Sequence, residues 1–166
     1  THSSPAKIFV KIVAQNEESL KIKPYIFILP GGPGANHSHY EDYGCLSTHG
    51  NVVFYDPRGC GQSSKDDSMN YTMDNYIEDV EIIRQLLNLK KIIILGKSCG
   101  AMAAVGFVIR YPSSVSKLIL AAGAASFKFL GTAKANVLAH GSVEQQAVCE
   151  ALWQGSFGSH EEVDHY

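Results

Sequence analysis

One serine in this chain stands where a nucleophile could act. The segment Gly96-Lys97-Ser98-Cys99-Gly100 matches the pattern G-x-S-x-G, after the apolar run Ile92–Leu95 and before the small-residue stretch Ala101–Tyr111. This order predicts a strand, a sharp turn and a helix, with the Ser98 hydroxyl exposed at the turn. The backbone N–H of Cys99, at the start of the helix, would then point at an oxyanion formed beside Ser98.

The pattern is short, so a chance match is one alternative reading of it. Phosphate binding is another, because Gly96-Lys97-Ser98 ends like the motif G-x-x-x-x-G-K-[ST]. That motif needs a glycine where Lys91 stands and a loop where Ile92–Leu95 predict a strand. We therefore reject the phosphate-binding reading.

Two more apolar runs end in glycine-rich loops. Tyr25–Leu29 precedes Pro30-Gly31-Gly32-Pro33-Gly34, and an N–H group of Gly31 or Gly32 could complete an oxyanion hole. Asn51–Tyr55 precedes the segment from Asp56 to Ser63, Asp-Pro-Arg-Gly-Cys-Gly-Gln-Ser. In that tight loop we expect Arg58 to hold Asp56 or nearby carbonyl groups.

With these three motifs the chain resembles the α/β-hydrolase family, and within it the proline iminopeptidase group of serine aminopeptidases. Residues 31–34 match the end of the family motif H-G-G-P-G, residues 56–63 match D-x-R-G-C-G-x-S, and residues 96–100 match G-x-S-x-G. The resemblance extends from about Lys7 to about Ser126. It implies an α/β-hydrolase fold with a mostly parallel sheet and helices on both faces.

The chain departs from the family at the expected site. Pro30 stands where the family usually has histidine, so the hydrogen bonding of the glycine loop is expected to differ. Lys97 and Cys99 replace residue types common in the family, which changes the wall of the site and leaves substrate choice open. Candidates for lining the pocket are Pro30, Pro33, Gly34 and Lys97.

Composition is typical of an α/β enzyme core. The 166 residues are 45% hydrophobic and only 18% charged, which fits strands buried on both faces of a sheet. A net charge of −2 with seven scattered histidines indicates no nucleic-acid or membrane partner. No metal or organic cofactor is implied. Four cysteines without C-x-x-C spacing, and no signal-peptide pattern, favour a cytoplasmic protein with reduced thiols.

Hydrophobic periodicity predicts alternating strands and helices. Expected strands are Ile8–Ala14 (an edge strand of an opening hairpin or meander), Tyr25–Leu29, Asn51–Tyr55, Lys91–Leu95 and Val115–Ala122. Expected helices are His39–Leu46, Thr72–Leu87, Ala101–Tyr111, Thr132–His140 and Val143–Trp153, with a polar turn at Asn16–Ser19. Residues 1–126 are predicted to form the hydrolase core and residues 127–166 the beginning of a helical cap; the alternative is amphipathic helices packed on the sheet.

The chain lacks obvious partners for Ser98. In the family, an acid and then a histidine follow the nucleophile. After Ser98 the candidates are Asp164, His140, His160 and His165, none of which follows a predicted strand. His37 and His39 could border the pocket, but they precede Ser98, which is the wrong order for this family.

We therefore expect a truncated or cleaved chain, with the acid and base on a segment or companion polypeptide that also carries the remaining strands. An apolar strand at 115–122 would otherwise present an unpaired edge. The resemblance implies that Ser98 releases N-terminal residues, often proline, from short peptides through an acyl-enzyme, with Glu161 and Glu162 as weak candidates for binding the ammonium group. The alternatives are an esterase, thioesterase or carbon–carbon hydrolase of the same fold, a non-catalytic binding protein, or an interaction protein with a vestigial pocket.

Overall fold

The computed structural model describes residues 6–124 and 126–155. Contacts divide these residues into two compact units, one before residue 125 and one after it. The first unit is built around a sheet, and the second contains helices.

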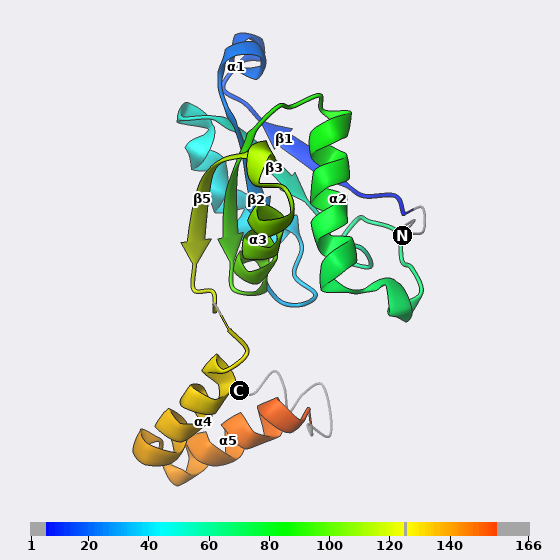
Figure 1. Cartoon of the computed structure of the whole chain (residues 1–166). Coiled ribbons are helices and arrows are strands. Elements are labelled where there is room, and N and C mark those ends of the chain that lie inside the picture. Colours follow the sequence, from blue (N-terminus) through cyan, green and yellow to red (C-terminus); the bar gives the residue numbers. More distant parts are fainter. Residues whose placement is uncertain (1–5, 125, 156–166) are drawn as a thin grey trace. The chain divides into compact units, whose positions relative to one another are not determined.

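The sheet of the first unit has five strands in the order β1-β3-β2-β4-β5 (Figure 1). The strands are β1 (Val10–Val13), β2 (Tyr25–Leu29), β3 (Asn51–Tyr55), β4 (Ile92–Lys97) and β5 (Val115–Ala121). β1 runs antiparallel to β3 and the other three pairs are parallel, so the mostly parallel sheet predicted from the sequence is confirmed. β1 is an edge strand, but it pairs with β3 rather than with β2, its neighbour in sequence, so it does not open a hairpin.

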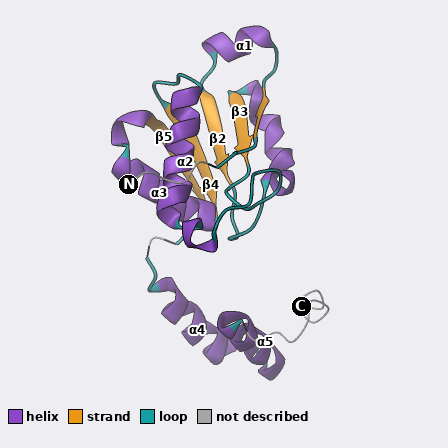
Figure 2. Ribbon diagram, turned by 90° about the vertical axis from the view of Figure 1, so that its right-hand side faces the viewer, coloured by secondary structure: helices purple, strands orange, loops and turns teal. Residues whose placement is uncertain are grey.

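Helices cover both faces of the sheet (Figure 2). Side chains alternate along β2: Phe27 and Leu29 join one apolar cluster, and Ile26 and Ile28 join the other. The first cluster is covered by α2 (Met73–Leu86) and α3 (Cys99–Arg110), the second by the 3₁₀ helix η1 (His37–Thr48). Both helix-bearing faces therefore bury apolar side chains of the same strands.

The segment predicted to be a polar turn forms the short helix α1 (Glu17–Ile22) instead. The side chain of Asn16 caps it by accepting a hydrogen bond from the Ser19 amide at 2.9 Å. Glu17 and Glu18 lie in its first turn, where the helix dipole favours negative charge. These polar residues therefore begin a helix here rather than a loop.

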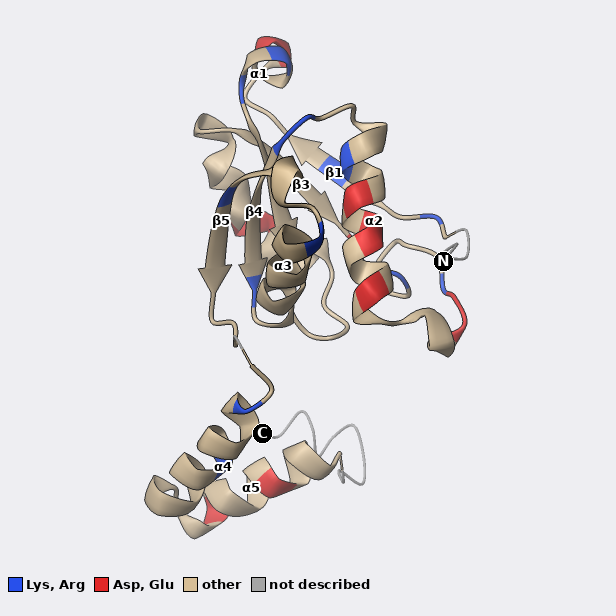
Figure 3. Ribbon diagram, viewed as in Figure 1, with Lys and Arg blue, Asp and Glu red and all other residues tan. Residues whose placement is uncertain are grey.

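Two acidic residues of α2 are buried although they lie off its apolar stripe. Asp79 is 3% exposed and Glu81 is 5% exposed. Each is paired with an arginine: Asp79 with Arg58, and Glu81 with Arg84. Acidic residues elsewhere on α2 are more exposed, and Figure 3 shows the acidic row along this helix.

β5 is the outermost strand on the β4 side of the sheet, and its side chains are largely exposed. Leu118, Ile119 and Leu120 are 37%, 45% and 49% exposed. Within residues 6–124 and 126–155, no strand pairs with the free edge of β5. An apolar strand with one unpaired edge is unusual on the surface of a folded protein.

The second unit contains α4 (Phe129–His140) and α5 (Val143–Gln154). α4 begins three residues before the predicted start at Thr132, whereas α5 begins as predicted at Val143, after a capping box formed by Ser142 and Gln145. No helix in the described part of the chain is long and apolar enough to cross a bilayer. The candidates His160, Glu161, Glu162, Asp164 and His165 lie outside the described residues.

Candidate active site

Ser98 occupies the sharp turn between β4 and α3. Its φ of 54° and ψ of −120° lie in a sparsely populated region, a conformation that costs roughly 1–3 kcal/mol and persists only where the surroundings enforce it. The surroundings are tight: a Cβ atom on Gly100 would lie 2.1 Å from the carbonyl oxygen of Leu29, and one on Gly96 would lie 2.4 Å from that of Gly100. The Ser98 amide also donates to the Ala121 carbonyl at 2.9 Å. The two glycines of the motif are therefore required by close backbone contacts on either side of Ser98.

The amides expected to form the oxyanion hole differ in whether their N–H groups already have a hydrogen-bond partner. Cys99 is the first residue of α3, so its N–H group has no partner within the helix. Gly31 N–H donates a 2.8 Å hydrogen bond to the buried hydroxyl of Tyr40, so it is not free to bind an oxyanion. Gly32 is exposed, with a φ of 113° that favours glycine. Of the two glycine amides expected to serve as donors, the one of Gly31 is therefore already bonded within the protein.

The glycine loop lies against the turn that carries Ser98. A Cβ atom on Gly31 would lie 3.0 Å from Cβ of Ser98 and 2.9 Å from the Lys97 carbonyl oxygen. The end of β2 and the end of β4 are neighbours in the sheet, with Leu29 opposite Gly96. Parallel pairing of these two strands brings the two loops together at one edge of the sheet.

A pocket of about 530 Å³ opens beside this turn. Four of the predicted site residues line it: Gly31, Pro33, Gly34 and Cys99. The rest of the lining comes from the loop after β3 and from the start of α2, namely Pro57, Arg58, Gly59, Cys60, Asn70, Tyr71, Thr72, Met73, Tyr76 and Asp79. A pocket of this size is typical of sites for small organic ligands.

Pro30 and Lys97 were predicted to line the pocket, but neither is among the lining residues that the structure describes. Pro30 is buried, and its carbonyl oxygen accepts a 2.8 Å hydrogen bond from the Tyr76 hydroxyl. Lys97 is exposed, with Nζ 5.7 Å from the centroid of the Tyr40 ring.

Arg58 contacts the carboxylates of Asp79 and Asp66, whereas the sequence predicted contact with Asp56 or nearby carbonyl groups. Its Nε and Nη2 donate to both carboxylate oxygens of Asp79 at 2.7 Å, and its Nη1 donates to Asp66 at 3.0 Å. Burial raises the pKa of Asp79, and the hydrogen bonds from Arg58 oppose that shift. The hydrogen bond to Asp79 is also the main reason why the pKa of Arg58 is raised.

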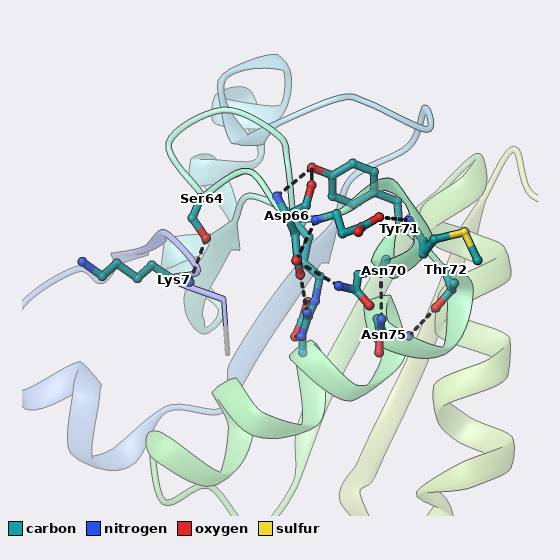
Figure 4. A network of polar contacts seen from close by, with 11 residues as sticks. Lys7, Ser64, Asp66, Asn70, Tyr71, Thr72 and Asn75 are labelled. Atoms are coloured by element: carbon teal, nitrogen blue, oxygen red, sulfur yellow. Dashed lines mark hydrogen bonds and ion pairs between the residues drawn. The ribbon is translucent and has the colours of Figure 1, made fainter. Parts of the chain in front are cut away.

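Asp66 carries this network onward to the pocket wall (Figure 4). Its carboxylate accepts from the side-chain amide of Asn70 at 2.9 Å, and its carbonyl oxygen accepts from the Tyr71 hydroxyl at 2.8 Å. Asn70 and Tyr71 both line the pocket. Arg58 therefore joins the wall of the pocket to the buried face of α2.

Asp56 and His37 form a separate buried pair. The Asp56 carboxylate accepts from the His37 amide at 2.8 Å and from the Gln62 amide at 2.7 Å, and the His37 ring Nδ1 lies 2.7 Å from it. His37 is 9% exposed and is not among the residues lining the pocket, while His39 is exposed. This pair ties the loop after β2 to the loop after β3, and the hydrogen bonds of the two histidines go to Asp56 and to the Asn36 carbonyl oxygen rather than to Ser98.

Comparison with known proteins identifies the family. A family model of the alpha/beta hydrolase fold matches residues 24–144. The chain belongs to the α/β-hydrolase family. It is 31% identical over 162 residues to a proline iminopeptidase of Clostridioides difficile (strain 630), covering 95% of this chain and 54% of the relative. It is 36% identical over 104 residues to a proline iminopeptidase of Saccharolobus solfataricus, covering 61% of this chain and 34% of the relative.

Solved structures show the same hydrolase fold. The proline iminopeptidase of Mycobacterium smegmatis superimposes with a TM-score of 0.77 at 20% identity, over 98% of this chain and 56% of that one. An esterase from Exiguobacterium antarcticum superimposes with a TM-score of 0.61 at 28% identity, over 72% of this chain and 42% of that one. The chain spans about half the length of the curated relatives that it matches along most of its length.

Four residues around the candidate site were not predicted to belong to it: Tyr40, Asp66, Tyr76 and Asp79. One signal for Asp79 was present, because it lies three residues after Tyr76 and four before Ile83, at the border of the apolar stripe of α2. A carboxylate at that position predicts a buried cation as its partner. Nothing comparable marked Tyr40, which lies in a polar 3₁₀ helix.

Proposed function

We propose that this chain supplies the nucleophile and oxyanion hole of a serine hydrolase that releases N-terminal residues, proline among them, from short peptides. The observation that carries the proposal is the strained Ser98 turn lying against the Gly31–Gly32 loop. The name proline iminopeptidase, borne by relatives at about 30% identity, supports the aminopeptidase specificity. No metal or organic cofactor enters the proposed reaction.

In the proposed mechanism the Ser98 hydroxyl oxygen attacks the substrate carbonyl carbon, and its proton passes to a base. The backbone N–H groups of Cys99 and Gly32 stabilise the oxyanion, and losing one such donor costs about 3 kcal/mol of transition-state stabilisation. The proton then moves to the leaving amine, and water hydrolyses the Ser98 ester. Burial raises the pKa of the Cys99 thiol, so Cys99 serves as a wall residue rather than as a second nucleophile.

The base and its acid are proposed to lie on a segment or companion polypeptide outside these 166 residues. His37 is committed to Asp56, and the exposed edge of β5 offers a place for further strands. Residues from 127 onward are proposed to begin a helical cap domain. The experiment is the intact mass of the purified protein under denaturing conditions: a second species with strand-forming sequence and a histidine supports the proposal. A lone 18.0 kDa species that turns over substrate contradicts it.

The proposed activity is tested by comparing hydrolysis of a prolyl arylamide with that of simple p-nitrophenyl esters, in a preparation with all its chains. Ser98→Ala should abolish both turnover and labelling by a fluorophosphonate. Faster turnover of the arylamide supports the aminopeptidase. Labelling of Ser98 with turnover of esters alone would support an esterase instead.

An esterase, thioesterase or carbon–carbon hydrolase is the second candidate, because the fold alone does not decide the substrate. The observation in its favour is the likeness to an esterase structure at 28% identity. Absence of Ser98 labelling in the complete preparation would point to a non-catalytic binding protein.

We also propose a cytoplasmic location, since all four cysteines are free thiols.

A further inference from the structure

Two tyrosine hydroxyls hold one peptide group of the glycine loop. The Gly31 N–H donates to the Tyr40 hydroxyl at 2.8 Å, and the Tyr76 hydroxyl donates to the Pro30 carbonyl oxygen at 2.8 Å. The N–H and the C=O belong to the same peptide unit, the one that joins Pro30 to Gly31. Both polar atoms of that unit are therefore bonded to side chains rather than to another strand.

The two tyrosines come from opposite faces of the sheet. Tyr40 lies in η1 and belongs to the apolar cluster that contains Ile26 and Ile28. Tyr76 lies in α2 and packs against the other cluster, with its ring 5.8 Å from that of Tyr55. Each hydroxyl is thus carried by a ring that is itself fixed by packing on its own side.

Holding both atoms fixes the plane of the Pro30–Gly31 peptide, because a peptide unit is rigid and planar. Only the two backbone torsions of Gly31 then separate this plane from the Gly32 N–H. Space around Gly31 is limited as well, since a Cβ atom at this position would lie 2.9 Å from the Lys97 carbonyl oxygen and 3.0 Å from Cβ of Ser98. The direction of the Gly32 N–H relative to Ser98 therefore depends on the two hydroxyls.

Pro30 explains why side-chain hydroxyls orient this peptide unit. Proline has no N–H group, so this residue cannot donate a hydrogen bond that would orient the loop. Burial raises the pKa of the Tyr76 hydroxyl above its ordinary value, which favours the protonated form that donates to Pro30. The hydroxyls thus supply an orienting contact that the backbone at Pro30 cannot provide.

We propose that Tyr40 and Tyr76 are positioning residues that aim the Gly32 N–H at the oxyanion formed on Ser98. The inference rests on the proposed hydrolase function for its catalytic consequence, but the hydrogen bonds themselves do not. Neither tyrosine needs to touch the substrate carbonyl. Their effect is to set the geometry of a donor that acts only in the transition state.

The kinetic test compares Tyr40→Phe and Tyr76→Phe with wild type in the complete enzyme, all chains included. Tyr111→Phe is the matched control, because it also removes a hydrogen-bonded hydroxyl, here one that donates to Glu78 at 2.8 Å, on the surface between α2 and α3. We expect kcat to fall about 10- to 100-fold in each positioning variant with KM within about twofold, since small displacements of a catalytic donor have effects of that size. The control should stay within about twofold of wild type in both constants.

A second measurement does not depend on activity. Hydrogen exchange of the Gly31 N–H, followed by NMR, should be protected in wild type, about 10-fold or more faster in Tyr40→Phe, and unchanged in Tyr111→Phe. Unchanged kcat in both positioning variants, or unchanged exchange at Gly31 in Tyr40→Phe, overturns the inference. If the wild-type protein shows no turnover at all, the proposed function fails, and the exchange result alone decides whether the Tyr40 hydroxyl holds the Gly31 N–H.

Discussion

Replacing Asp79 by alanine is expected to destabilise the protein strongly. The side chains of Arg58 and Asp79 are only 5% and 4% exposed and share two 2.7 Å hydrogen bonds. Removing the carboxylate leaves a buried guanidinium that still pairs with Asp66 at 3.0 Å. Breaking such a pair by deleting one partner typically costs about 3–5 kcal/mol. Because the contact with Asp66 remains, we expect the free energy of unfolding to fall by about 3 kcal/mol, the lower end of that range.

Asp74→Ala is the matched control on the same helix. Asp74 also pairs with an arginine, Arg110, at 2.5 Å, but the two side chains are 77% and 38% exposed. Water screens this pair, and holding two long side chains in one geometry offsets what attraction remains. We therefore expect the control to change stability far less than Asp79→Ala, although both substitutions remove one carboxylate and one ion pair.

The assay is urea unfolding followed by far-ultraviolet circular dichroism, because the one tryptophan of the chain, Trp153, lies in α5 and not in the unit that contains the sheet. The midpoint should fall in Asp79→Ala with the denaturant slope unchanged. Equal midpoints for the two variants would refute the reasoning, since it would mean that burial of the Arg58–Asp79 pair has no energetic consequence.

Three other outcomes follow from the structure. Gly100→Ala should cost about 2–3 kcal/mol and abolish fluorophosphonate labelling of the protein, because its Cβ would overlap backbone; normal stability and labelling would contradict the turn geometry. Gly131→Ala, in open space on α4, should instead stabilise that helix by up to about 1 kcal/mol, as judged by thermal unfolding. Burial alone would raise the pKa of Glu81, but hydrogen bonds from Arg84 and Gln85 lower it overall. A group with a lowered folded pKa stabilises above its unfolded value of about 4.3, so Glu81→Gln should weaken the protein at pH 7 and approach wild type in urea midpoint below about pH 4; a constant gap would contradict this.

Strand positions were predictable wherever the apolar run was continuous. β3 has the predicted bounds, Asn51–Tyr55, and β2 has the predicted bounds, Tyr25–Leu29. The partner of β1 was not predictable, because pairing with β3 rather than β2 depends on the order of strands in the finished sheet. The helix α1 was missed because its capping by Asn16 uses the same residue types as a polar turn.

Within the candidate site, features that depend on neighbouring residues were predictable, and contacts between residues far apart in the chain were not. The turn at Ser98 followed from its flanking glycines, which the neighbouring backbone demands. The partner of Arg58 did not follow from neighbouring residues, since Asp79 lies 21 residues away on another element. The hydrogen bond from the Gly31 N–H to Tyr40 was not predictable either, because Tyr40 lies nine residues further along the chain in a 3₁₀ helix with weak hydrophobic periodicity.

The amino-acid sequence by itself determined the family, the strand–turn–helix at Ser98 and the glycine loops that follow β2 and β3, because each depends on residues next to one another in the chain. Only the tertiary structure decided which hydrogen-bonding groups remain available there. The Tyr76 hydroxyl reaches Pro30 across 46 residues, and such a contact exists only once α2 has packed on the sheet. A buried polar group takes whatever partner the packing brings within reach, and the sequence does not state that partner.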